Sequence, residues 1–493
     1  MSSALILTCV AVYSILLFGV TWYTSRGANN ETFFVGNRSS KWYLVAYGMI
    51  GASLSGVTFI SVPGAVGLAK FGYLQVVLGY SIGYIVIALL LLPLYYRLNL
   101  TSIYSYLEQR FGNYSYKTGA FFFILSRTIG AAFRLYIVVN VLQIFVFDTL
   151  GVPFFVTVAA FLILILLYTY QGGVKTIVYT DTLQTTFMLL SVVLSVVFIS
   201  KQLNLNFGDL YHKIADSQYS QMIFSDWKLN TFLPKQFFGG MFIAIAMTGL
   251  DQELMQKNIS CKTLRDAQKN VFTFTFVVLI VNILFLVLGA LLYIYVNQLN
   301  IPLLLDENGK IISDNVFPTI ALNYLGPFSA IFFIIGLISA TYPSADGALT
   351  ALTSVFCIDF LGLEGNKIKS EKQKIKIRHT VHIAFATILL FVIVLFKLIN
   401  NASVINNLLA VAGYTYGPLL GLYSFGLFTK KMLNDKWVPL VCVLSPIVCF
   451  ALNEYSQQWF GGYKFGYELL IVNGFITFIG LFIISKKKIE SFE

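Results

Sequence analysis

The sequence predicts an all-α polytopic membrane protein, and three observations lead to this class. Of the 493 residues, 57% are hydrophobic and only 11% are charged, whereas soluble domains carry about 25% charged residues. The mean hydropathy is +0.78. The apolar residues form long continuous runs without the alternation of a membrane β-barrel, so each run is expected to cross the bilayer as a helix. These features exclude a secreted disulfide scaffold, a disordered protein and an ordinary cytosolic enzyme.

About thirteen runs are long enough to cross a membrane, which takes about 20 apolar residues. The first run has no basic segment or cleavage site of a signal peptide, so we predict a retained helix there. No composition shift marks a second domain, and we predict a single transmembrane domain over residues 1–493. The predicted spans are 4–23, 42–68, 74–97, 118–147, 153–170, 178–200, 235–256, 271–297, 326–358, 380–398, 403–428, 437–454 and 466–485.

The basic residues predict the orientation of the chain in the membrane. Most of the 33 lysines and arginines lie in alternate loops, beginning with the loop after the first span. Cytoplasmic loops carry such an excess, so the N-terminus is expected outside and the C-terminus in the cytoplasm. We predict a bacterial cytoplasmic membrane as the location. The same bias accounts for the net charge of +11 without a nucleic-acid partner.

Two spans contain residues that interrupt helices. The span at 42–68 holds Gly51, Gly56 and Pro63, and the span at 235–256 lies five spans later and holds Gly249. Interrupted spans at matching places in two halves indicate an inverted-repeat transporter. The repeats would cover about 42–200 and 235–428, with additional helices at 4–23, 437–454 and 466–485. Close packing through small residues is the alternative for the first of these spans.

Hydroxyl groups and charges mark further positions inside the predicted spans. The span at 326–358 carries Ser344 among several Ser and Thr residues, with Asp346 near its middle. Hydroxyl oxygens suit an alkali cation, although they also serve helix packing. A mid-membrane carboxylate such as Asp346 indicates function because it costs several kcal/mol to bury. Asp181 lies near the start of its span and has an interfacial position as the alternative.

Arg127 and Arg134 are seven residues apart, so they lie on about the same face of one helix. Two buried cations require anions, which are either Asp346 and Asp181 or a carboxylate on a solute. Asp251 and Glu253 end the span at 235–256, where we expect them to meet Lys257 or water.

An enzyme is not predicted. His212, His379 and His382 fall in or beside polar loops, and the five cysteines show no metal-ligand spacing. A membrane enzyme would need a cluster of catalytic residues at one interface, which the sequence lacks. A channel or a transport-like sensor remains as a more remote alternative to a transporter.

The chain resembles the sodium:solute symporter family over about residues 1–485. The matching motifs are GASLSGVTFISVPG, YQGGVKTIVYTDTLQT, GLDQELMQKNISCKTLRDAQK, ISATYPSADGALTALTSVFCID and AGYTYGPLLGLYSFGLF. The resemblance implies a LeuT-type fold with a 5+5 inverted repeat. It also implies sodium-coupled import of a small organic solute by alternating access, with one or two sodium ions and the lipid bilayer as partners.

The resemblance carries a set of site residues to this sequence. A common sodium site would use the carbonyls of Gly51, Leu54 and Ala340 and the hydroxyl of Ser344, with Pro343 where the family has a second hydroxyl. A second sodium site, present in some members, would match Asp181, with Asp346 and Gly347 in place of serines. The solute would meet Ser53, Ser55, Thr58, Gln75, Arg134 and Asn406, with Tyr73 and Tyr414 as gates.

Arg134 favours an acidic solute, such as a sialic acid or another carboxylate, over a neutral sugar, which remains the alternative. One Na⁺ crossing 100 mV supplies about 2.3 kcal/mol, and a tenfold gradient adds about 1.4 kcal/mol. A monoanion carried with one Na⁺ moves no net charge and gains only the second term. An acidic solute therefore favours two sodium ions.

Overall fold

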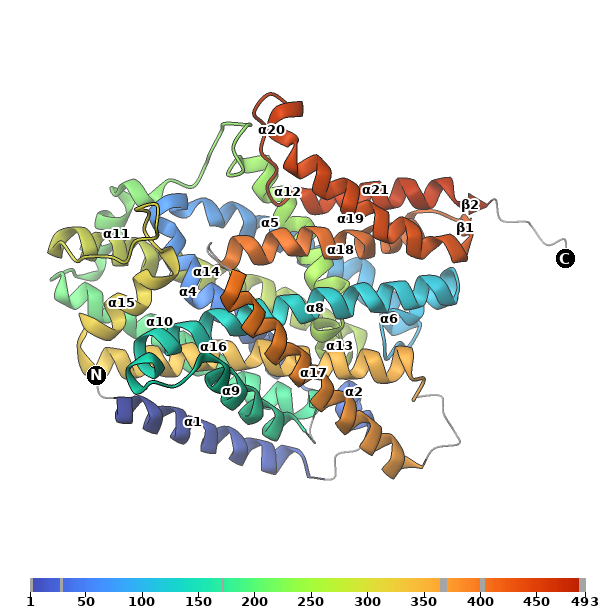
Figure 1. Ribbon diagram of the computed structural model, residues 1–493, viewed down its shortest axis with the longest axis horizontal. Coiled ribbons are helices and arrows are strands. Elements are labelled where there is room, and N and C mark those ends of the chain that lie inside the picture. Colours follow the sequence, from blue (N-terminus) through green and yellow to red (C-terminus); the bar gives the residue numbers. More distant parts are fainter. Residues whose placement is uncertain (1–2, 27–29, 171–172, 364–369, 400–403, 487–493) are drawn as a thin grey trace, which may run out of the picture.

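The computed structural model describes residues 3–486 apart from 27–29, 171–172, 364–369 and 400–403. Helices dominate the described residues (Figure 1). Eight of them are long and apolar enough to cross a membrane, and shorter apolar helices accompany them. The prediction of an all-α polytopic membrane protein is therefore confirmed.

The helices of the first half of the chain follow one another through short connections. They are α1 (Ser3–Thr24), α2 (Asn30–Val35), α3 (Trp42–Ser53), α4 (Gly56–Ala69), α5 (Tyr73–Val86), α6 (Leu92–Arg97), α7 (Ser105–Arg110), α8 (Asn113–Leu142), α9 (Phe154–Thr169), α10 (Gly173–Gln202) and α11 (Phe207–Ala215).

The second half begins after a longer connection. It comprises α12 (Leu233–Ala244), α13 (Gln252–Ile259), α14 (Leu264–Leu299), α15 (Val316–Asn323), α16 (Gly326–Val355), α17 (Glu371–Ile399), α18 (Val404–Phe428), α19 (Val438–Glu454), α20 (Ser456–Trp459) and α21 (Leu469–Ile483). The strands β1 (Met432–Leu433) and β2 (Ser485–Lys486) pair antiparallel.

Helices occupy every range in which a span is predicted, but several begin earlier than the apolar run. The helix α17 begins at Glu371 and not at 380, and α14 begins at Leu264 and not at 271. Their first turns are polar, so hydropathy alone does not include them. Both extensions carry good helix formers such as Lys, Arg and Gln, which continue a helix beyond the apolar region.

The long helices pack side by side, with α1 at one edge and α19 and α21 at the opposite edge (Figure 1). In the interior, α10 packs against α3 and α16, and α14 packs against α4. The helices α5 and α12 approach most closely where Gly79 meets the backbone of Phe237, because a Cβ at Gly79 would lie only 2.0 Å from the Phe237 carbonyl oxygen. The interior helices thereby surround the two interrupted spans.

Candidate functional site

The predicted break in the first interrupted span is present. The helix α3 ends at Ser53, and α4 begins at Gly56. Between them, the Leu54 N–H still donates to the Ile50 carbonyl at 2.8 Å, but Ser55 has φ 2° and ψ 174° and leaves the helical path. A helix end leaves carbonyl groups without helical partners, and at membrane depth these groups must find other ones.

The end of α3 lies against α10 and α16. The Gly51 N–H donates to Thr185 Oγ1 at 3.0 Å, and a Cβ at Gly51 would lie 3.5 Å from Pro343 Cγ. This approach places Gly51 and Leu54 beside the α16 segment that holds Ala340 and Ser344. Both α16 residues are fully buried, and Ser344 Oγ donates to the Thr341 carbonyl at 2.9 Å within its own helix.

A cavity of about 80 Å³ opens at the same break. Its wall combines the broken segment with α5, α8, α12, α14 and α18. Five of the predicted solute and gate residues line it, namely Ser53, Ser55, Thr58, Tyr73 and Arg134.

Arg134 faces this cavity without an ionic partner among the described residues. Its side chain is 9% exposed, and its Nε and Nη1 atoms have no hydrogen-bond partner. Asp346, one of the two anions that the sequence offered for the arginines, instead accepts a hydrogen bond from the Tyr168 hydroxyl at 2.8 Å. The wall of the cavity therefore presents a buried cation that is free to meet an anion.

Arg127 lies about two helical turns from Arg134 on α8 and is already paired. Its guanidinium forms an ion pair with Glu253, and its Nη1 lies 3.6 Å from Asp251 Oδ2. Tyr416 also donates to Asp251 at 2.6 Å. The expectation that Asp251 and Glu253 meet Lys257 or water is therefore wrong. The reason is that the second interrupted span breaks at Leu250 and Asp251, and Asp251 caps the N-terminus of α13 inside the protein.

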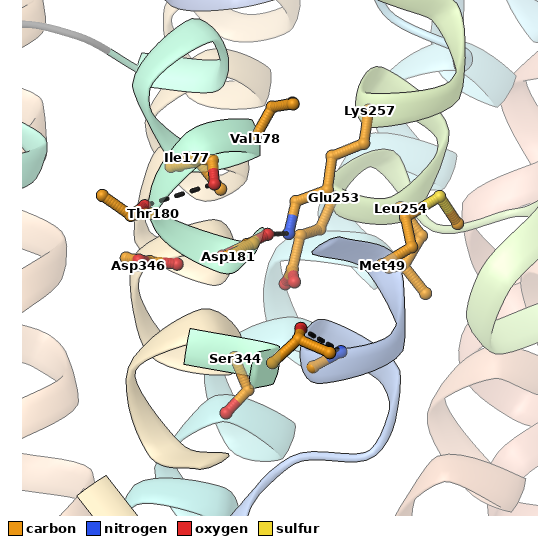
Figure 2. A network of polar contacts seen from close by, with 12 residues as sticks. Met49, Ile177, Val178, Thr180, Asp181, Glu253, Leu254, Lys257, Ser344 and Asp346 are labelled. Carbon is orange, nitrogen blue, oxygen red and sulfur yellow. Dashed lines mark hydrogen bonds and ion pairs between the residues drawn. The ribbon is translucent and has the colours of Figure 1, made fainter. Parts of the chain in front are cut away.

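Asp181 pairs with Lys257, which lies just beyond the end of the predicted span at 235–256. The Lys257 ammonium lies 2.7 Å from Asp181 Oδ2, and both residues are at most 1% exposed. Figure 2 shows the Asp181 carboxylate pointing toward Lys257, with the Glu253 carboxylate close by and Asp346 on the other side of Asp181. The spacing of Lys257, four residues after Glu253 on one helix face, suggests Glu253 as its partner, so local sequence gives no signal for the pair with Asp181.

Of the predicted solute and gate residues, two do not line the cavity, and the side chain of a third lies outside the described residues. Gln75 is buried and donates to the carbonyls of Gly72 and Thr231. Tyr414 accepts from Asn453 at 2.9 Å and packs against Phe450, so it faces α19. The side chain of Asn406 lies outside the described residues.

His382 corrects the expectation that all three histidines fall in or beside polar loops. It is 1% exposed within α17, and its two ring nitrogens lie 2.8 Å from the hydroxyls of Thr169 and Thr353. His382 lies two residues inside the predicted span at 380–398, and because α17 begins already at Glu371 it lies well within the helix and not at its end.

Comparisons with known proteins agree with this arrangement. The model of the sodium:solute symporter family matches residues 33–436. The sodium/sialic acid symporter NanT of Aliivibrio fischeri is 25% identical, and the alignment covers 94% of this chain and 90% of that protein. Sodium-coupled monocarboxylate transporter 1 of Xenopus laevis is 26% identical over 82% of this chain and 65% of its own length.

Among solved structures, a Na⁺-coupled sialic acid symporter in a substrate-bound outward-open state superposes with a TM-score of 0.82 at 19% identity. The match covers 98% of this chain and 99% of the other. This structural match supports the predicted LeuT-type fold. The family model covers most of the sequence. The chain belongs to the sodium:solute symporter family and is a membrane transporter that couples solute movement to Na⁺.

Proposed function

We propose that this symporter imports a small organic carboxylate, such as a sialic acid, and that Arg134 binds the carboxylate. The observation that carries the proposal is the buried guanidinium of Arg134 in the cavity wall, with Nε and Nη1 unpartnered. A planar guanidinium matches a carboxylate with two parallel hydrogen bonds, which is the strong form of this contact. The hydroxyls of Ser53, Ser55 and Thr58 line the same cavity and suit the polar groups of a sugar acid.

The names of several relatives point in the same direction, whereas two others are a sodium/iodide cotransporter and a sodium/glucose cotransporter. Two relatives are sodium/sialic acid symporters, from Aliivibrio fischeri and Proteus mirabilis, and others are sodium-coupled monocarboxylate transporters. Sialic acids and monocarboxylates all carry a carboxylate. The bacterial relatives also support a bacterial cytoplasmic membrane as the location. The basic residues of the loops support an N-terminus outside and a C-terminus in the cytoplasm.

For the coupling ion, we propose a site made of the carbonyls of Gly51, Leu54 and Ala340 and the hydroxyl of Ser344. The break after α3 supplies carbonyl oxygens, and α16 lies against it. Hard oxygen ligands of this kind suit Na⁺. Because the two halves of the site belong to α3 and α16, ion binding would favour the conformation in which these helices are together, and that conformation would then bind the solute. We propose the inverted repeats at about 42–200 and 235–428 as the parts that rock.

The test is uptake of labelled N-acetylneuraminate into proteoliposomes with an inward Na⁺ gradient. Wild-type protein is expected to accumulate it, and an outward or absent gradient is expected to abolish accumulation. Arg134→Ala should raise the half-saturating concentration at least tenfold, whereas Arg134→Lys should lose less because it keeps the charge. Unchanged affinity in Arg134→Ala, or uptake of glucose in place of the acid, would contradict the proposal and favour a neutral sugar.

A further inference from the structure

Lys257 is a buried charge that the proposed function does not use. It lies in α13, and its side chain is 1% exposed. Lysines are almost never fully buried unless they are paired. Its ammonium is 2.7 Å from Asp181 Oδ2, on α10. This contact joins the two halves of the chain across the helices that carry the proposed sodium site.

The surroundings of Asp181 are those of a cation site. Asp346 lies beside it on α16 (Figure 2), and both carboxylates have one buried oxygen without a hydrogen-bond partner, Asp181 Oδ1 and Asp346 Oδ1. The second Asp346 oxygen accepts from Tyr168. On α3, a Cβ at Gly48 would lie 2.9 Å from Asp181 Cβ, so glycine lets α3 pack directly against this carboxylate.

Asp181 is the carboxylate that pairs with Lys257, because the other nearby carboxylate, on α13, has a different partner. Glu253 is on the same face of α13, but it already pairs with Arg127. Glu253 is also held in place by α16, because a Cβ at Gly347 would lie 2.6 Å from Glu253 Oε1. Asp181 is therefore the carboxylate that compensates the ammonium, and Lys257 is the cation that compensates Asp181.

A sodium ion and the Lys257 ammonium compete for the same oxygen atoms. Both are monovalent cations, and two cations held at one carboxylate repel each other strongly at low dielectric. The ammonium is attached to the chain, so its effective concentration at Asp181 does not depend on the medium and greatly favours it over a dissolved ion. The Asp181 carboxylate thus does not fit a second sodium ion while the Lys257 ammonium is in place.

We propose that Lys257 is a tethered cation that takes the place of a second sodium ion at Asp181, and that it sets the coupling at one Na⁺ per transport cycle, in contrast to the two ions expected from the sequence for an acidic solute. The inference rests on the proposed function in one respect, since it counts the ion at Gly51, Leu54, Ala340 and Ser344 as the one that remains. Lys257 thus determines the number of bound ions, and it is not among the residues that line the cavity proposed for the solute.

The test counts sodium ions bound to the purified full-length protein in detergent, by equilibrium binding of ²²Na⁺ without any solute. Wild-type protein is expected to bind one ion per chain. Lys257→Met should bind two, because the freed Asp181 and Asp346 accept the second. The double variant Asp181→Asn with Lys257→Met removes both charges and should return to one. Lys262→Met changes an exposed lysine a short distance away and should stay at one.

Folding is checked by the melting temperature of each variant in NaCl and in choline chloride. A folded Lys257→Met that binds no more ions than wild type would overturn the proposal, as would two ions on wild type. If Lys257→Met does not fold, the sodium ions bound to wild type and to Lys257→Gln are counted instead. The same numbers of ions then support or overturn the proposal. If wild type binds no sodium ion but Lys257→Met binds one, the result would contradict the sodium site proposed at the end of α3 and would support the role of Lys257. Failure of N-acetylneuraminate uptake with one bound ion would contradict the proposed solute alone.

Discussion

Arg127 shows how one residue connects the cavity to the interior charges. It lines the cavity beside Arg134, yet its guanidinium is 2% exposed and is paired with Glu253 and Asp251. Two arginines at the same helix face therefore have different chemistry. Arg127 is neutralised by the protein, and only Arg134 offers its charge to a solute.

Removing Arg127 should destabilise the protein strongly. In Arg127→Met, two buried carboxylates lose their cation, and breaking a buried ion pair on one side costs about 3–5 kcal/mol. The measurement is the free energy of unfolding in detergent. The control Arg265→Met removes an exposed arginine from the start of α14 and should change stability by less than about 0.5 kcal/mol. Equal losses in the two variants would show that the Arg127 pairs contribute nothing.

At the scale of helices, the sequence predicts which spans break but not how they pair their charges. Gly51, Gly56 and Gly249 mark both interruptions, because glycine weakens a helix wherever it occurs. Hydropathy cannot reveal that α13 continues inside the protein after the second break, since its sequence QELMQKNI is polar. Lys257 consequently looks like a loop residue, although it is one of the most buried charges of the chain.

Some site residues could be predicted from the sequence and others could not. Ser53, Ser55, Thr58, Tyr73 and Arg134 reach the cavity because they follow from the break and from one helix face. Tyr414 does not, because it lies on the side of α18 that meets α19, where it bonds to Asn453. The rotation of a helix that is apolar all round is set by its neighbours and leaves no periodic signal.

The contact between α3 and α16 makes a prediction for Gly51. In Gly51→Ala the new Cβ would lie 2.5 Å from Thr185 Oγ1, so either the Thr185 hydroxyl must rotate and lose its hydrogen bond from the Gly51 N–H, or the end of α3 must move away from α10. Apparent sodium affinity should fall about tenfold, which corresponds to about 1.4 kcal/mol. Titration of ²²Na⁺ binding measures it. Gly19→Ala is the matched control, since nothing lies within 4 Å of its added Cβ, and an equal loss there would show that the effect is not local.

For the whole molecule, the number of ions decides the driving force. One Na⁺ with a monoanionic solute moves no net charge, so only the sodium gradient drives uptake. At a tenfold gradient, accumulation is then limited to about tenfold, whatever the membrane potential. Two ions would add one net charge and about 2.3 kcal/mol per 100 mV.

Proteoliposomes with a potassium diffusion potential set by valinomycin measure this difference. With N-acetylneuraminate as the solute, wild-type uptake should not change when the inside is made negative, because the Lys257 ammonium stays with the protein and carries no charge across. Lys257→Met should become potential-dependent if it still transports, since the second positive charge then moves with the solute. Wild-type uptake that rises steeply with an inside-negative potential would contradict one-ion coupling, while uptake that is equally insensitive in a transporting Lys257→Met would show that Asp181 does not recruit a second ion.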